Sequence, residues 1–183
     1  AYEYQANVPT YAAAANGVLY VKKGATGGGS SWSDAIGELS DALLVSEMIS
    51  GVSQIWTAAG TYYPDNTAGT GSTSRDKSFN LLSNIKLYGG FAGTETATTQ
   101  RRISSHPSIL SGDLGTVGDN SDNAYHVVTV SGSLGTASLD GFTITGGNAN
   151  GSLNITINSN SLERNIGGGI FTYNSSVPFK NLT

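Results

Sequence analysis

The sequence predicts an all-β fold of the parallel β-helix (solenoid) type, with an amphipathic helix capping its N-terminal end. Three observations predict this class. Short runs of β-favouring residues recur at intervals of roughly 15 to 25 residues, as in repeat architectures. Several runs meet paired glycines, and one helical pattern lies near the N-terminus. Because one coil of such a fold cannot bury its own inward residues, successive coils must stack to build the core.

The N-terminal region divides into a leader and a cap. Residues 1–17 are small and polar with several tyrosines, which indicates a leader segment. The first β-type run covers residues 18–21. We expect residues 18–51 to form an N-terminal cap and residues 52–183 to form successive strands, all within a single domain.

The cap contains the pattern of an amphipathic helix. Ser31 and Asp34 have capping-box spacing, in which each side chain satisfies a free backbone N–H at the helix start. Gly51 is placed to end the helix. Apolar residues recur at steps of three and four, as on one helix face: Trp32, Ala35, Ile36, Leu39, Ala42, Leu43 and Met48. We expect this face to cover the first open coil.

After Gly51 the pattern becomes that of short strands. The β-type runs cover residues 55–58, 61–64, 85–88, 108–110, 126–130, 139–145, 153–157, 169–171 and 177–183. Paired glycines follow or precede several of them, because sharp corners need backbone angles that other residues adopt only with strain. The last run reaches the end of the sequence, which suggests a truncated N-terminal piece of a longer protein.

A β-sandwich also has many short strands and turns. The paired glycines at strand ends, the single helix near the N-terminus and the abundance of asparagine in the turns favour the solenoid.

Composition excludes several classes of partner. The formal net charge is −4, and the nine Lys and Arg residues are scattered along the chain. Without a basic stripe in the sequence, nucleic acid is not expected as a partner. Cysteine is absent, which removes disulfides and thiolate metal sites. No apolar run is long enough to span a bilayer, so no transmembrane segment is expected.

The chain resembles right-handed parallel β-helix repeat proteins of bacterial cell surfaces. The resemblance extends from about residue 18 to the end, and its motifs follow one another in the same order. The clearest are Ile55 to Pro64, Leu87-Tyr88-Gly89-Gly90-Phe91, Leu139 to Gly147 and Gly167-Gly168-Gly169-Ile170. The last, with Phe171 to Asn174, is also similar to short repeats of polymorphic outer-membrane autotransporters.

This resemblance implies an exported protein that is secreted or held at the bacterial surface. The wider pectate-lyase-like superfamily includes adhesins, polysaccharide lyases and glycoside hydrolases, so the fold does not decide the function. We expect a non-enzymatic, adhesin-like chain that presents a binding face for glycans or surface proteins. The alternative is the N-terminal part of a lyase or hydrolase that acts on acidic polysaccharide.

The richest polar cluster lies between residues 112 and 123. Asp113, Asp119, Asn120 and Asp122 could supply oxygen ligands for calcium, the only cofactor that the sequence suggests. The spacing does not match an EF-hand loop. The other interpretation is a surface loop in which Asp and Asn stabilise turns through their own backbone.

Catalytic residues are not evident. Arg101, Arg102 and Arg164 lie outside clear strand patterns, and Asp140 is the one acidic residue within a strand, without an obvious partner. A glycosidase needs two carboxylates at a set separation. We therefore expect no active site, and a structural role for His106 and His126.

The aromatic residues suggest two roles. Trp32 and Trp56 fall on apolar faces and are expected in the core. Four tyrosines could either stack on sugars from an exposed sheet face or lie at the edge of the core: Tyr62, Tyr63, Tyr88 and Tyr173.

Two further expectations follow from the predicted fold. An enzyme should carry outward acidic and basic side chains on neighbouring strands of one sheet, whereas an adhesin should carry Ser, Thr, Asn and aromatic residues there. The sequence favours the second pattern. An open C-terminal coil would also leave strand edges unpaired, so we expect end-to-end self-association.

Overall fold

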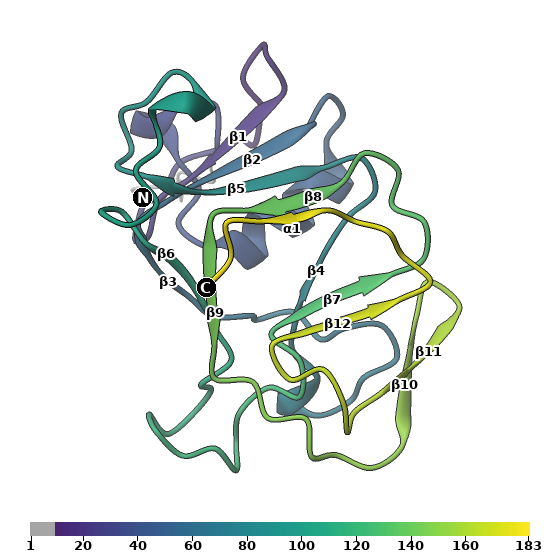
Figure 1. Cartoon of the computed structure of the whole chain (residues 1–183). Helices are drawn as coiled ribbons and strands as arrows, with labels where there is room; N and C mark the ends of the chain where they lie inside the picture. The colour runs from purple at the N-terminus through teal and green to yellow at the C-terminus, as the bar shows by residue number, and fades with distance from the viewer. Residues whose placement is uncertain (1–9) are drawn as a thin grey trace, which may run out of the picture.

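The computed structural model describes residues 10–183, and this part of the chain is rich in β-strand with one α-helix (Figure 1). The largest sheet contains, in spatial order, β1 (Val18–Val21), β2 (Gln54–Ala58), β5 (Lys86–Phe91), β8 (Ser138–Asp140) and β13 (Phe179–Lys180). A second sheet contains β3 (Gly60–Tyr62), β6 (Ser108–Ser111) and β9 (Phe142–Thr145). A third contains β4 (Phe79–Asn80), β7 (Val128–Ser131) and β12 (Ile170–Tyr173).

Every strand pairing within these three sheets is parallel. The chain visits the sheets in a repeating order, from the first to the second to the third and back to the first. Each return adds a strand beside the one laid down on the previous visit. The prediction of short parallel strands, made from glycine turns and β-type runs, is therefore confirmed for most of the chain.

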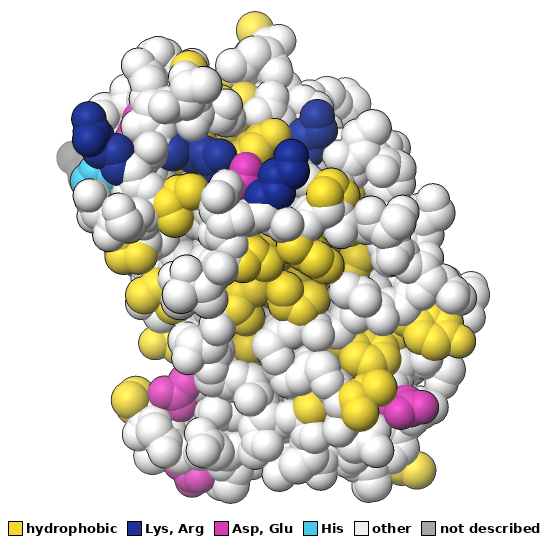
Figure 2. All heavy atoms as spheres, in the orientation of Figure 1, with side chains coloured by type: hydrophobic (Ala, Val, Ile, Leu, Met, Phe, Trp, Pro, Cys, Tyr) yellow, Lys and Arg dark blue, Asp and Glu magenta, His cyan; other side chains and the backbone are white. Residues whose placement is uncertain are grey.

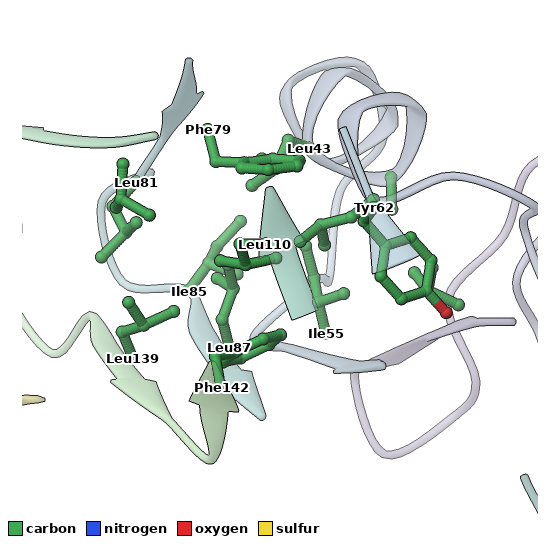
Figure 3. Close-up of a cluster of buried hydrophobic side chains, with 14 of the residues drawn as sticks. Leu43, Ile55, Tyr62, Phe79, Leu81, Ile85, Leu87, Leu110, Leu139 and Phe142 are labelled. Carbon is green, nitrogen blue, oxygen red and sulfur yellow. The ribbon is translucent and has the colours of Figure 1, made fainter. Parts of the chain in front are cut away.

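The register places apolar residues of successive strands directly beside one another. In the largest sheet Leu19 pairs with Ile55, Ile55 with Leu87, and Leu87 with Leu139. All four side chains are fully buried. Side chains from the other two sheets point toward them, as Figure 3 shows for Tyr62, Leu110, Phe142 and Phe79. The core thus lies between the three sheets.

The helix α1 (Leu39–Met48) covers one end of this core. Leu39, Ala42, Leu43 and Val45 are buried and belong to the same apolar cluster as the strand residues. The helix contacts β1 and β4, each of which is the edge strand of its sheet. Figure 3 shows Leu43 lying against Phe79 of β4. The amphipathic segment therefore seals the end from which the strands accumulate.

The helix is shorter than its sequence pattern predicted. The Ser31 hydroxyl does accept from the backbone N–H of Asp34, at 3.2 Å, but it caps only the 3-10 turn η1 (Trp32–Asp34). The Asp34 carboxylate instead binds the glycine-rich loop, accepting from Gly28 N at 2.9 Å. Residues 35 and 36 are extended, because Ile36 bridges to Val21 at the edge of the largest sheet.

Of the predicted apolar face, Trp32, Ala35 and Ile36 therefore precede the helix, and Met48 lies within it but points to solvent. Trp32 is half-buried in a separate cluster, and Met48 is 76% exposed. The helix ends before Gly51, whose φ of 85° places it in the left-handed region.

The run at 153–157 was predicted as another parallel strand, and that prediction is wrong. It forms β10 (Asn154–Ile157), which pairs antiparallel with β11 (Asn160–Glu163) in a separate two-stranded hairpin. The turn residues Asn158 and Ser159 both have positive φ, as a tight hairpin turn requires. The hairpin projects at one side of the third sheet (Figure 1). Its buried residues pack on Ala68 and Phe171.

The paired glycines have a steric cause. A Cβ at Gly89 would lie 2.5 Å from the carbonyl oxygen of Gly141, and one at Gly147 would overlap the Gly168 carbonyl. Neighbouring segments thus approach too closely for any side chain, which explains why glycine recurs at the corresponding strand ends.

The predicted leader, residues 1–17, lies partly outside the described residues, which begin at Thr10. Within residues 10–17, Ala12 donates from its backbone to the Gly28 carbonyl, so this part is joined to the cap. Within residues 10–183, no helix has the length and apolar character needed to cross a membrane.

Candidate functional site

The main candidate site is a polar groove between α1 and the loop at residues 113–117, with a volume of about 570 Å³. We call it the α1 groove. The start of α1, the end of β3 and the segment at η2 (Ser74–Asp76) form its remaining walls. Its lining residues are Lys23, Glu38, Ser40, Asp41, Tyr63, Pro64, Asp65, Ser74, Lys77, Asp113, Leu114, Gly115 and Val117.

Two adjacent tyrosines at the end of β3, Tyr62 and Tyr63, point to opposite sides of the strand, as successive strand residues do. Tyr62 is fully buried, and its hydroxyl donates to the Ala58 carbonyl at 3.0 Å. Burial raises the pKa of Tyr62 to about 12. The neighbouring Tyr63 points the other way and is 41% exposed in the groove. Of the two roles that the sequence left open, Tyr62 therefore takes the core role, whereas the exposed Tyr63 ring lies in the groove with the Lys23 ammonium 5.7 Å from its centroid.

The groove carries more negative than positive charge. The Lys23 ammonium pairs with Glu38 at 2.6 Å, and the Lys77 ammonium pairs with Asp65 at 2.5 Å. No ion pair within residues 10–183 involves the other lining carboxylates, Asp41 and Asp113. Burial and the nearby carboxylates of Glu38 and Asp65 raise the pKa of Asp41.

Two smaller cavities along α1 lie near the groove. A cavity of about 210 Å³ shares Ser40 with it, and a third cavity of about 290 Å³ shares Glu47, Asn80 and Leu82 with the second. Leu44, 42% exposed, contributes apolar surface between them.

The four residues predicted to bind calcium lie in one loop but act on its backbone. Asp113 accepts from Gly118 N at 3.1 Å, Asp119 from Ser121 N at 2.8 Å, and Asp122 from Thr116 N at 2.8 Å. The Asn120 side chain accepts from the Asn123 amide at 3.2 Å. Among the residues that the structure describes, no three acidic or histidine side chains form a group that could hold a metal ion. Calcium binding stays a prediction, and these contacts fit the turn-stabilising interpretation.

The outer face of the largest sheet carries a cluster of aromatic side chains. Tyr20, Trp56 and Tyr88 pair across β1, β2 and β5, on the opposite side of the sheet from the leucine column. Trp56 is 4% exposed and stacks on Phe91 at 4.7 Å between ring centroids. The prediction that the tryptophans lie in the core is confirmed for Trp56, which is buried in a core cluster with Val18 and Phe91, and Trp32 is partly buried against the same cluster.

On the next strands of that face the aromatic column gives way to charges. Tyr88 pairs with Asp140 of β8, and Asp140 pairs with Lys180 of β13. Arg101 reaches Asp140 with its Nη2 at 3.0 Å, so this aspartate has the partner that the sequence did not reveal. Both patterns expected for the outer face, aromatic and charged, therefore occur on one sheet.

A buried ion pair joins the hairpin to the rest of the chain. The Arg164 guanidinium donates to both carboxylate oxygens of Asp76, at 2.6 and 3.0 Å. The Asp76 side chain is fully buried, and it also accepts from Thr73 N at 2.9 Å. Hydrogen bonds from Arg164 and Thr73 outweigh desolvation and lower the pKa of Asp76 to about 2.

The remaining predicted site residues, His106, His126 and Tyr173, do not line the α1 groove. His126 is buried against Phe171, its Nδ1 lies 3.1 Å from the Gly167 carbonyl, and burial lowers its pKa. The His106 backbone N–H donates to the Arg102 carbonyl. Tyr173 is 42% exposed on β12, away from the residues that line the groove.

Comparison with known proteins adds no relative to these observations. No protein-family model, no curated protein and no solved structure matches this chain.

Proposed function

We propose that the chain is part of a right-handed parallel β-helix. The repeating visits to three parallel sheets support this, as do the buried columns of residues from neighbouring strands. Crossover connections between parallel strands are almost always right-handed, which is the basis for the proposed hand. The end-covering helix fits the role of a cap for such a coil.

We further propose that this β-helix is a non-enzymatic, secreted or surface-exposed scaffold that binds glycans through the α1 groove. The observation that carries the proposal is Tyr63, an exposed aromatic ring beside side chains that can bind hydroxyl groups. A sugar ring can pack on the tyrosine, while the carboxylates of Asp41 and Asp113 accept hydrogen bonds from its hydroxyls.

The charge of the groove bears on the alternative function. An enzyme for acidic polysaccharide needs groups that neutralise the substrate carboxylates. Both lysines of the groove are already paired, and the acidic lining residues would repel a polyanion. The groove therefore favours neutral glycans.

Replacing Tyr63 with alanine should weaken glycan binding about tenfold, since an aromatic contact of this kind contributes roughly 1 kcal/mol or more. Neutral oligosaccharides selected on a glycan array would be titrated calorimetrically into both forms of the protein. Tyr173→Ala is the matched control, because Tyr173 is equally exposed and lies away from the groove residues. Equal loss of affinity in both variants would count against the groove, and turnover of any glycan would overturn the non-enzymatic part of the proposal.

The chain is also proposed to associate end to end through the face opposite α1. There β9, β12 and β13 are the edge strands of their sheets. Phe179 of β13 pairs with Leu139, so it continues the inward column that begins at Leu19, and it is 38% exposed. Figure 2 shows an apolar patch at the centre of this face, between the areas of β8 and β7 in Figure 1. Half-buried residues that pack against the core supply apolar surface: Ile144, Ile170, Val177 and Leu182.

Light scattering at several protein concentrations should show a mass that rises above that of one chain. Phe179→Lys should shift the protein toward the monomer, because it places a charge on the apolar edge. Met48→Lys is the control, since Met48 is exposed on the helix at the opposite end. A constant monomer mass at every concentration would refute the association.

A further inference from the structure

The outer face of the largest sheet carries a basic row that the scattered sequence positions do not reveal. Figure 2 shows Lys and Arg side chains gathered across the upper half of the molecule, over the region of β5 and β8 in Figure 1. The residues that form the row are Lys86, Arg101, Arg102 and Lys180, with Asp140 between them.

Strand pairing and side-chain contacts place three of these residues, Lys86, Arg101 and Lys180, on the same outer face. Lys86 alternates with the buried Leu87 and therefore points outward from β5. Lys180 pairs with Asp140, the residue that follows Tyr88 in the outward column. Arg101 spans the same column, because it contacts Asp140 and lies over the Tyr88 ring at 5.0 Å.

Most of the positive charge in the row is uncompensated. Asp140 balances Arg101, but none of the ion pairs within residues 10–183 involves Lys86, Arg102 or Lys180. All nine Lys and Arg residues of the chain fall within this described part. The Asp140 carboxylate also accepts a hydrogen bond from the Asn181 amide at 2.7 Å, so its oxygens are engaged by neighbouring side chains of the protein.

An open cavity of about 680 Å³ adjoins the row. Its lining combines the guanidinium-bearing Arg101 and Arg102 with the polar side chains of Ser104, Ser105, Thr143 and Asn181. Charged and neutral hydrogen-bond donors on one surface are the groups that bind carboxylates and sulfates.

We propose that the basic row is a binding surface for an acidic glycan, a polysaccharide that carries carboxylate or sulfate groups along its chain. Neighbouring strands lie about 4.8 Å apart, so cations on β5 and β13, two strands apart, meet charges that repeat along a polymer. This surface is distinct from the α1 groove, and its net charge is positive where that of the groove is negative. The proposal does not depend on glycan binding in that groove.

A nucleic acid fits this surface less well. Proteins that bind single strands offer exposed aromatic rings on which bases stack. Here Arg101 lies over Tyr88, while Trp56 and Phe91 are buried. The row thus offers charge and hydrogen bonds without a free stacking platform.

The test uses the whole 183-residue chain and three probes of similar length: an oligogalacturonate, a heparin oligosaccharide and a neutral maltooligosaccharide. We expect calorimetric binding of one or both acidic probes and none of the neutral probe at this surface. Raising the salt concentration should weaken the binding, because exposed charges are screened. The variant Arg102→Ala/Lys180→Ala should lose affinity about tenfold, as expected for two exposed charge contacts.

The control variant is Met48→Glu/Leu153→Glu, which lowers the net charge by the same amount at two exposed sites outside the row. It should bind the acidic probes almost as tightly as the parent. Equal losses in the two variants would overturn the proposal, since only overall charge would then matter. Equal affinity for an oligonucleotide of the same charge would overturn the assignment to glycans. If Tyr63→Ala binds neutral glycans more weakly but acidic glycans as tightly as the parent does, the row and the α1 groove are separate sites.

Discussion

Replacing Asp76 with alanine should destabilise the protein by about 3 to 5 kcal/mol, because it leaves the Arg164 charge without its partner in a buried site. The Asp76 side chain is fully buried, and that of Arg164 is 11% exposed. Four further contacts depend on the same carboxylate or guanidinium, including those to Ser72 and Thr73. Chemical denaturation followed by circular dichroism measures the change in the free energy of unfolding.

The exposed ion pair supplies the comparison. Asp65, with 78% of its side chain exposed, pairs with Lys77 at the surface, and Asp65→Ala should cost no more than about 1 kcal/mol. A similar cost for the two variants would show that the Asp76 pair is not the buried link between the hairpin and the main sheets.

The same carboxylate makes stability depend on pH in a defined window. The pKa of Asp76 is about 2 in the folded chain, against an ordinary value of 3.8. Its contribution is complete above the ordinary value and is lost as the pH falls toward 2, where the folded chain also takes up the proton. The Asp76→Asn variant should therefore lose less stability than the parent between pH 4 and pH 2.

Replacing Leu87 with alanine should cost about 2 to 5 kcal/mol, because it opens a cavity in the centre of the core. Leu87 is fully buried and lies between Ile55 and Leu139 on the two neighbouring strands. Denaturant midpoints measured by circular dichroism would report the loss. The slope of the transition should stay unchanged if the fold is retained.

Met48→Ala is the matched control for this substitution. Met48 is 76% exposed at the end of α1, and alanine is favourable in a helix. Its cost should lie within about 0.5 kcal/mol of zero. Equal effects at the two sites would contradict the inward column that runs from Leu19 to Leu139.

The two candidate surfaces differ in how their charges arise. In the α1 groove, acidic residues from the helix start, the end of β3 and the loop at Asp113 converge around Tyr63. In the basic row, cations come from β5, from β13 and from the segment after η3 (Thr98–Gln100). The acidic groove should disfavour polyanions, and the basic row should favour them. A variant of one surface can therefore be compared with a variant of the other in the same binding assay.

The amino-acid sequence by itself determined the β-rich class, the positions of most parallel strands and the presence of one apolar helix face. These properties depend on local patterns: alternation along a strand, glycine at sharp corners and periodicity along a helix. The apolar pattern predicted a helix that starts too early, because Ile36 pairs with Val21 at the edge of β1 instead of being helical. No local sequence signal indicates that pairing. It also missed β4 and β11, which are short or depend on a partner strand.

Only the tertiary structure decided which side chains meet. Asp76 and Arg164 are 88 positions apart, and the basic row joins residues from 86 to 180. Parallel strands bring such positions together through register, which depends on how many residues each connecting loop contains and how tightly it packs. The sequence gives the number of residues in each loop but not the path that the loop takes in space. It therefore showed scattered charges where the fold forms a buried pair, an acidic groove and a basic row.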